Sequence, residues 1–339
     1  MQTITLEQPG QLTFTHTPEP GPAPEGYALV RVRRIGVCGT DIHAYNGKQP
    51  FFSYPRILGH ELGVEIIEIG ANACGLKVGD KCSVEPYLNC GKCIACRRGK
   101  GNCCTTLQVL GVHADGGHRE LIHVPINKLH KSEKLTLDQL ALVETLGIGA
   151  HAVDRAAVEE GETVLVIGTG PIGCAVIQFA QAAGARVIAM DMNESRLAFC
   201  RETLGVSDTV LASGPDVVQA LKDLTNGDLP TAVFDATGNP RSMMGTFEYP
   251  AHGGRLVFVG LFQGDVTFND PNFHKRELTL MGSRNARSED FQRIIRLIEA
   301  GKVDTTAWIT HRASFEDAVN QFPTWVKPET GVLKAMIEL

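Results

Sequence analysis

The chain lacks both an excess of positive charge and a recognisable targeting segment. Its 339 residues carry 32 lysines and arginines against 38 aspartates and glutamates, for a net charge of -6. Because there is no basic block, the sequence does not indicate nucleic-acid binding. Residues 1–10 lack a charged segment followed by an apolar core, so we expect no signal peptide. Ten cysteines without such a leader predict a cytoplasmic protein, in which closely spaced cysteines bind metal more often than they form disulfides.

One stretch without charge is long enough to raise the question of a membrane span. Residues 163–185 contain no Asp, Glu, Lys or Arg, and about 20 apolar residues can cross a bilayer. Glycines, a proline and two glutamines interrupt the stretch, which is typical of a strand, a turn and a helix. We therefore expect no membrane partner.

The length and the changing texture of the chain predict a mixed α/β fold with two domains. Residues 1–150 are rich in Gly and Pro with short alternating β-branched runs, which predicts an irregular β-rich domain. Residues 151–285 alternate apolar strands with helical segments, as in a doubly wound parallel sheet of the Rossmann type. Residues 286–339 add an amphipathic helix at 288–300 and a final strand at 331–339.

Four closely spaced cysteines form the most specific motif of the chain. They follow the pattern C-x2-C-x2-C-x7-C and are Cys90, Cys93, Cys96 and Cys104. Cysteines two residues apart can direct both sulfurs to one point, and four of them can enclose a tetrahedral zinc with no open position. Such a zinc stabilises a lobe and does no chemistry. Cys103 adjoins Cys104, so spacing alone leaves the fourth ligand open.

A glycine motif follows the apolar strand expected at 163–167 and precedes a helix. It comprises Gly168, Thr169, Gly170, Pro171, Ile172 and Gly173. In a G-x-G-x-x-G turn the first glycine permits the tight turn, the second admits a pyrophosphate, and the third lets helix and strand pack closely. The N–H groups at the start of the helix then face the phosphates. The motif predicts a dinucleotide cofactor.

Two charged residues bear on the choice of dinucleotide. Asp191 lies eighteen residues after Gly173, at the expected end of the second strand. A carboxylate there can accept the ribose hydroxyls of NAD and repels the 2′-phosphate of NADP. Arg196 can pair with a 2′-phosphate, so NADP stays open, but we expect NAD.

A scattered polar set in the first domain suggests a second metal. The segment Cys38-Gly-Thr40-Asp41-Ile-His43 and the segment Gly59-His60-Glu61 supply a thiol, a hydroxyl, imidazoles and carboxylates. Taken singly, such residues are more often core cysteines or hydrogen-bonded histidines than ligands. Beside a nicotinamide site they suggest a catalytic zinc with mixed sulfur, nitrogen and oxygen ligands and one position for substrate.

These motifs, in this order along nearly the whole chain, resemble the zinc-dependent medium-chain dehydrogenases of the alcohol dehydrogenase superfamily. The branch acting on sorbitol, threonine and sugar acids is the most similar. It shares Pro50-Phe-Phe-Ser-Tyr-Pro, Gly111-Val-His-Ala-Asp-Gly-Gly and Met281-Gly-Ser-Arg-Asn-Ala. The resemblance implies a homodimer or homotetramer. It also implies a GroES-like catalytic domain built from residues 1–150 and 286–339, an inserted NAD-binding domain, and an active site in the cleft between them.

The resemblance also implies the metal ligands. Cys38 and His60 match ligands of a catalytic zinc. The third protein ligand is either Glu61 or Glu144, and we expect the two to exchange as substrate enters. Asp41 matches a residue that orients the imidazole of His60. For the structural zinc, in a lobe of about residues 86–106, the family spacing selects Cys104 over Cys103, which gives two zinc ions per subunit.

Further roles follow from the same resemblance. Thr40 and His43 match a proton relay, and Arg284 matches an arginine near the nicotinamide. Lys48, Phe51 and His113 join Arg284 as candidates to contact substrate. One departure concerns the usual Glu-Pro pair, which is Glu144-Thr145 here and could loosen the placement of Glu144.

The predicted activity is hydride transfer from a secondary alcohol, a polyol or a sugar acid, to NAD, which leaves a ketone. Threonine, sorbitol or a sugar phosphate are alternative substrates. The alternative outside the enzymes is a regulatory protein that binds the nicotinamide cofactor without catalysing a reaction. A zinc-free quinone reductase would lack both the cysteine lobe and Cys38.

Overall fold

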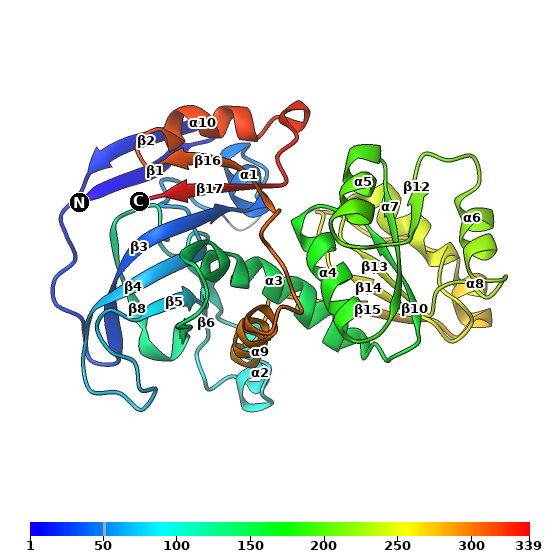
Figure 1. The fold of residues 1–339 in the computed structure, drawn as a ribbon, viewed down its shortest axis with the longest axis horizontal. Coiled ribbons are helices and arrows are strands. Elements are labelled where there is room, and N and C mark those ends of the chain that lie inside the picture. The colour runs from blue at the N-terminus through cyan, green and yellow to red at the C-terminus, as the bar shows by residue number, and fades with distance from the viewer. Residues whose placement is uncertain (50–51) are drawn as a thin grey trace. The chain divides into compact units, whose positions relative to one another are not determined.

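The computed structural model describes residues 1–49 and 52–339. These residues form two compact units, one made of residues 1–145 and 286–339 and the other of residues 146–285. The boundary falls within helix α3 (Leu137–Ala156). Each unit has its own main sheet, and Figure 1 labels the elements of both.

In the described part of the chain, unit 1 contains a seven-stranded sheet in the order β16-β17-β3-β4-β5-β9, with β8 paired to β3. The strands of this sheet are β3 (Tyr27–Val37), β4 (Glu61–Ile69), β5 (Lys81–Val84), β8 (Leu121–Pro125), β9 (Leu129–Lys131), β16 (Ile309–Ser314) and β17 (Lys334–Glu338). Two-stranded sheets pair β1 (Gln2–Gln8) with β2 (Gln11–His16) and β6 (Tyr87–Leu88) with β7 (Gln108–Val109). The helices that begin in this unit are α1 (Gly39–Tyr45), α2 (Ile94–Arg97), α3, α9 (Ser288–Glu299) and α10 (Ala318–Trp325).

The order of strands brings distant parts of the sequence together. The red strand β17 lies beside the blue strand β3, and β4 lies on the other side of β3 (Figure 1). Alternate apolar residues of β3, among them Val30 and Val32, are fully buried in the core of the unit, as the period of two in a strand requires. The register pairs Gly36 of β3 with both Glu61 and Met336. Residues near 61 and 336 therefore lie on neighbouring strands.

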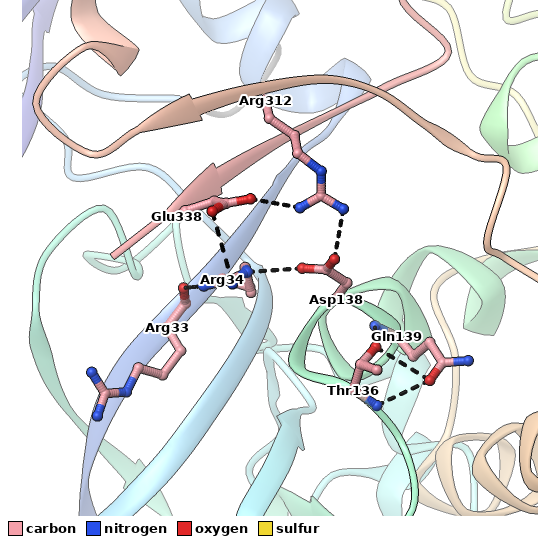
Figure 2. A network of polar contacts seen from close by, with 7 residues as sticks. All are labelled: Arg33, Arg34, Thr136, Asp138, Gln139, Arg312 and Glu338. Carbon is pink, nitrogen blue, oxygen red and sulfur yellow. Dashed lines mark hydrogen bonds and ion pairs between the residues drawn. The ribbon is translucent and has the colours of Figure 1, made fainter.

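A network of ion pairs joins α3 to this sheet (Figure 2). Asp138, in the first turn of α3, accepts from Arg34 of β3 over 2.8 Å and from Arg312 of β16 over 2.6 Å. Arg312 also pairs with Glu338 of β17 over 2.6 Å. Burial opposes ionisation of Asp138, but the two guanidinium groups outweigh it and lower its pKa. Four charges from four elements therefore hold the start of α3.

Unit 2, all of whose residues are described, contains a six-stranded parallel sheet in the order β12-β11-β10-β13-β14-β15. Its strands are β10 (Thr163–Ile167), β11 (Arg186–Asp191), β12 (Asp208–Leu211), β13 (Ala232–Asp235), β14 (Arg255–Phe258) and β15 (Thr279–Gly282). Its helices are α4 (Pro171–Ala182), α5 (Glu194–Glu202), α6 (Val217–Leu224), α7 (Pro240–Gly245) and α8 (Asp270–Lys275).

The strand order of unit 2 reverses at β10, whose neighbours are β11 and β13. Ligands of doubly wound sheets bind at the carboxyl end of the strands at such a switch point. The uncharged run 163–185 consists of β10, a turn and α4, as predicted. Among the described residues, none of the helices is both long and apolar enough to cross a membrane. The predicted α/β fold class, with a doubly wound parallel sheet and a β-rich domain, is confirmed.

Candidate active site

The first candidate site is the cysteine lobe of unit 1. Cys93 precedes α2, Cys96 lies within it, and Cys104 follows the turn Gly101–Cys103. The sulfurs of these three residues and of Cys90 lie within 4.8 Å of one another, and Sγ of Cys93 is 3.5 Å from Sγ of Cys96. A tetrahedral zinc with Zn–S bonds of about 2.3 Å requires sulfurs roughly 3.8 Å apart. The donor set therefore fits zinc.

Main-chain N–H groups favour the metal-binding thiolate form of Cys90 and Cys93. The N–H of Cys93 donates to Sγ of Cys90 over 3.4 Å, and the N–H of Cys90 donates to Sγ of Cys104 over 3.3 Å. The N–H groups of Cys96 and Thr105 lower the pKa of Cys93 to about 5, and the thiolate is the form that binds metal. Zinc binding by the four cysteines stays a prediction.

The neighbouring cysteine is placed differently. Cys103 is exposed, whereas Cys104 is buried and belongs to the group of four. The geometry therefore favours the ligand that the family spacing selected.

The second candidate site, also in unit 1, joins Cys38, His60 and Glu61. The thiol, an imidazole nitrogen and a carboxylate oxygen lie within 4.8 Å of one another. Cys38 stands between β3 and α1, and His60 directly precedes β4. The antiparallel pairing of β3 with β4 brings the two together. His60 and Glu61 are buried, and a mixed sulfur, nitrogen and oxygen set suits zinc.

Asp41 approaches this group from the first turn of α1. Its Oδ2 accepts the main-chain N–H of Cys38 over 2.9 Å, and its Oδ1 lies 3.6 Å from Nδ1 of His60. Burial disfavours a charged imidazole, but Asp41 and Cys38 outweigh it and raise the pKa of His60 well above its ordinary value. A carboxylate in this position is the arrangement expected for orienting a metal-binding imidazole.

Glu61 has a second partner that the sequence analysis missed. Nζ of Lys334, on β17, donates to both carboxylate oxygens of Glu61, over 2.6 and 2.7 Å. The same ammonium donates to the carbonyl of Val37 over 3.2 Å and to the hydroxyl of Thr145 over 3.3 Å. Lys334 is 1% exposed and Glu61 is 0% exposed. Burial disfavours both charges, but their pairing outweighs it, so the pKa of Glu61 is lowered and that of Lys334 is raised.

The space for this ion pair comes from a glycine. Gly36 lies opposite Glu61 in the β3–β4 pair, and a Cβ atom on Gly36 would overlap Oε2 of Glu61. Any other residue at position 36 would displace the carboxylate. Thr145, which replaces the proline usual in the family branch, supplies a hydroxyl to the same pair. The glycine at position 36 and the threonine at position 145 therefore both accommodate the ion pair of Glu61 and Lys334.

Glu144 has a neutral partner in place of a cation. It lies on α3, is 4% exposed, and its Oε1 accepts a short hydrogen bond from the hydroxyl of Tyr87 on β6. Burial raises the pKa of Glu144. Glu144 does not belong to the group within 4.8 Å that Cys38, His60 and Glu61 form. Tyr87 is the second residue that the sequence analysis missed.

The remaining candidates of unit 1 lie outside the two metal groups. Thr40 is half-buried and His43 is exposed, three residues further along α1. Lys48 is exposed after the end of that helix, and Nδ1 of His113 accepts the main-chain N–H of Val109 over 3.1 Å. Phe51 lies outside the described residues.

The candidate cofactor loop lies in unit 2, between β10 and α4. Gly168 has a φ of +84°, which a side chain would disfavour. Gly170 caps α4 and Pro171 begins it, followed by Ile172. A Cβ atom on Gly173 would overlap the carbonyl of Gly168, so close packing requires this glycine. The turn leads directly into a helix N-terminus, as a pyrophosphate site requires.

Asp191 ends β11 beside this loop. Its Oδ2 accepts the main-chain N–H of Thr169 over 2.7 Å. Arg196 lies in the first turn of α5, with Nη1 3.3 Å from the position that a Cβ on Gly170 would take. Both charged residues therefore adjoin the loop. Arg284 is exposed just after β15.

Two family comparisons agree with this geometry. Residues 171–300 match the zinc-binding dehydrogenase family, and residues 24–134 match the GroES-like domain of alcohol dehydrogenases. Together with the similarity over nearly the full length to a named dehydrogenase, they establish the class. The chain belongs to the zinc-type alcohol dehydrogenase family.

Individual relatives and solved structures are similar to the chain over nearly its whole length. The chain is 41% identical over 337 residues to L-galactonate-5-dehydrogenase of Escherichia coli K12, covering 99% of this chain and 98% of that one. An alcohol dehydrogenase of E. coli CFT073, solved with NADH, superposes with a TM-score of 0.92 at 29% identity and covers 100% of this chain and 99% of its own. A zinc-binding dehydrogenase of Sinorhizobium meliloti 1021, solved with NADP, gives a TM-score of 0.91 at 27% identity with coverage of 100% and 99%.

Proposed function

We propose that this dehydrogenase transfers hydride from a secondary alcohol of a polyol or sugar acid to NAD and leaves a ketone. The observation that most supports a zinc-dependent reaction is the group formed by the half-buried Cys38 and the buried His60 and Glu61, because its donor atoms suit a catalytic zinc. The glycine loop followed by Asp191 supports NAD as the cofactor.

The residues of this chain would divide the work as follows. Cys38, His60 and one of the two glutamates would hold the catalytic zinc, and the four cysteines of the lobe would hold a second zinc. When bound, zinc polarises the alcohol oxygen, and NAD accepts the hydride. Thr40 and His43, three residues apart on α1 and thus on one face of the helix, would pass the alcohol proton to solvent. Arg284 would contact oxygens of the cofactor or substrate.

The two glutamates are supported by different observations. Distance supports Glu61, which lies in the group with Cys38 and His60. The hydrogen-bond partners support Glu144. Its carboxylate is bound by the neutral hydroxyl of Tyr87 and, among the residues that the structure describes, has no ion pair to give up for a metal, whereas Glu61 is already paired with the ammonium of Lys334. We infer that the two glutamates exchange as zinc ligands. When Glu144 binds the metal, the carboxylate of Glu61 stays paired with the ammonium of Lys334.

The similarity to L-galactonate-5-dehydrogenase supports a sugar acid such as L-galactonate as substrate. Purified protein should be tested for NADH formation with L-galactonate, sorbitol, threonine and a sugar phosphate, with Cys38→Ser as the inactive control. A kcat/KM for L-galactonate that is higher than for the other three substrates would support the proposal. Turnover of threonine alone would refute the polyol or sugar-acid class, and turnover of sorbitol alone would refute a sugar acid as the substrate. NADH binding without turnover of any alcohol would favour a regulatory protein.

We also propose an oligomeric state and a cellular location for the protein. The family resemblance supports a homodimer or homotetramer, and the free cysteines agree with a cytoplasmic protein. Light scattering on the zinc-loaded protein measures the assembly, and a monomeric mass would refute it.

A further inference from the structure

The ribose end of the candidate cofactor loop carries a side chain with an unassigned role. Thr169 lies between the first two glycines of the loop and is 1% exposed. Its main-chain N–H donates to Oδ2 of Asp191 over 2.7 Å, and its hydroxyl donates to the same oxygen over 2.9 Å. Two donors from one residue therefore converge on one carboxylate oxygen.

These bonds use most of the acceptor capacity of Asp191. A carboxylate offers about four lone-pair positions, two on each oxygen. Oδ2 receives both bonds from Thr169, and Oδ1 accepts the main-chain N–H of Asn193 over 2.9 Å. One position on Oδ1 remains, while the two hydroxyls of an NAD ribose offer two donors. In this conformation Asp191 can accept one of them at full strength.

A cation stands beside the same loop. Nη1 of Arg196 lies 3.3 Å from the position that a Cβ on Gly170 would take. A guanidinium group binds phosphate through paired N–H groups and stays charged at any physiological pH. The loop thus combines a carboxylate with little spare acceptor capacity and a basic group suited to a 2′-phosphate.

We propose that the hydroxyl of Thr169 is a specificity-determining group that reduces the preference of this protein for NAD over NADP. The inference rests on the proposed function as an NAD-dependent dehydrogenase. The hydroxyl occupies an acceptor position that a ribose hydroxyl of NAD would otherwise use. By donating to Asp191 it also weakens the negative potential that repels a 2′-phosphate. Thr169 acts through Asp191 and is a positioning residue.

Two variants separate the hydroxyl from the shape of the side chain. Thr169→Val keeps the branched volume and the main-chain N–H but loses the hydroxyl, and Thr169→Ser keeps the hydroxyl. Dissociation constants for NADH and NADPH are measured by fluorescence titration of the zinc-loaded protein. Loss of one hydrogen bond should raise the ratio of the NADPH constant to the NADH constant roughly two- to tenfold in Thr169→Val, with Thr169→Ser within about twofold of wild type.

A wild-type ratio in Thr169→Val overturns the proposal. Equal weakening of both dinucleotides also overturns it, because that is the result of a purely structural role. If Thr169→Val does not fold, as judged by its melting profile, the same ratio in Thr169→Ala decides. If the wild-type protein binds neither dinucleotide, the proposed function itself fails and this inference fails with it.

Discussion

Lys334 is the most informative residue to change, because it is a buried cation whose main partner is a predicted zinc ligand. Lys334→Met keeps the length of the side chain and removes the charge, which leaves the carboxylate of Glu61 without its ammonium. Breaking a buried ion pair by removing one partner costs about 3–5 kcal/mol. For a unit of about 200 residues without zinc at Cys38 and His60, this predicts a fall in Tm of roughly 6–20 °C.

The structure also predicts that this loss depends on the catalytic zinc. With zinc at Cys38 and His60, the freed Glu61 can pair with the metal, so Lys334→Met should cost less. In a Cys38→Ser background that pairing is lost and the full cost should appear, which a double-mutant cycle measures as a coupling above about 1 kcal/mol. Calorimetry of the four proteins, with the exposed Lys302→Met as control, provides the data. An equal Tm decrease in both backgrounds would refute the link between Lys334 and the metal site.

Three further predictions follow from contacts in unit 1. Cys93→Ser should lower Tm and disrupt assembly, whereas the exposed Cys103→Ser should change neither; equal melting of the two would contradict the lobe assignment. Tyr87→Phe should lower the free energy of unfolding by about 1–3 kcal/mol, because the buried Glu144 loses its donor, and unchanged denaturant curves would argue against this contact. The pKa of Glu61 is lowered from 4.5, so its stabilising contribution should be complete above that pH and be lost as the pH falls below it. Denaturant titrations of wild type and Lys334→Met should therefore converge in acid, and a constant difference would contradict the pairing.

Local patterns in the sequence predicted much of the fold. The helix expected at 288–300 is α9, with Phe291, Ile294, Ile295 and Ile298 buried on one side. The strand expected at 331–339 is shorter, because Gly331 adopts a positive φ after the turn Pro328–Thr330 and β17 begins at Lys334. The grouping of the four cysteines was also predictable, since they lie within 15 residues of one another and their spacing constrains the sulfurs.

Long-range partners were not predictable in the same way. Lys334 and Glu61 are 273 positions apart, and their contact depends on the order β17-β3-β4 and its register. A lysine within the apolar segment 331–339 was the available signal, but alternation alone does not say which face of the strand it occupies. Tyr87 and Glu144 are 57 positions apart, and a tyrosine in a short loop strand gives no comparable signal.

The zinc content of the purified protein is the direct test of the two proposed metal sites. Elemental analysis of wild type, Cys38→Ser and Cys93→Ser should be read beside NADH formation with a sugar-acid substrate. We expect about two zinc ions per wild-type subunit and about one in Cys38→Ser, which should keep its fold and lose its activity. About one zinc in the wild type, or full activity in Cys38→Ser, would contradict a catalytic zinc at Cys38 and His60.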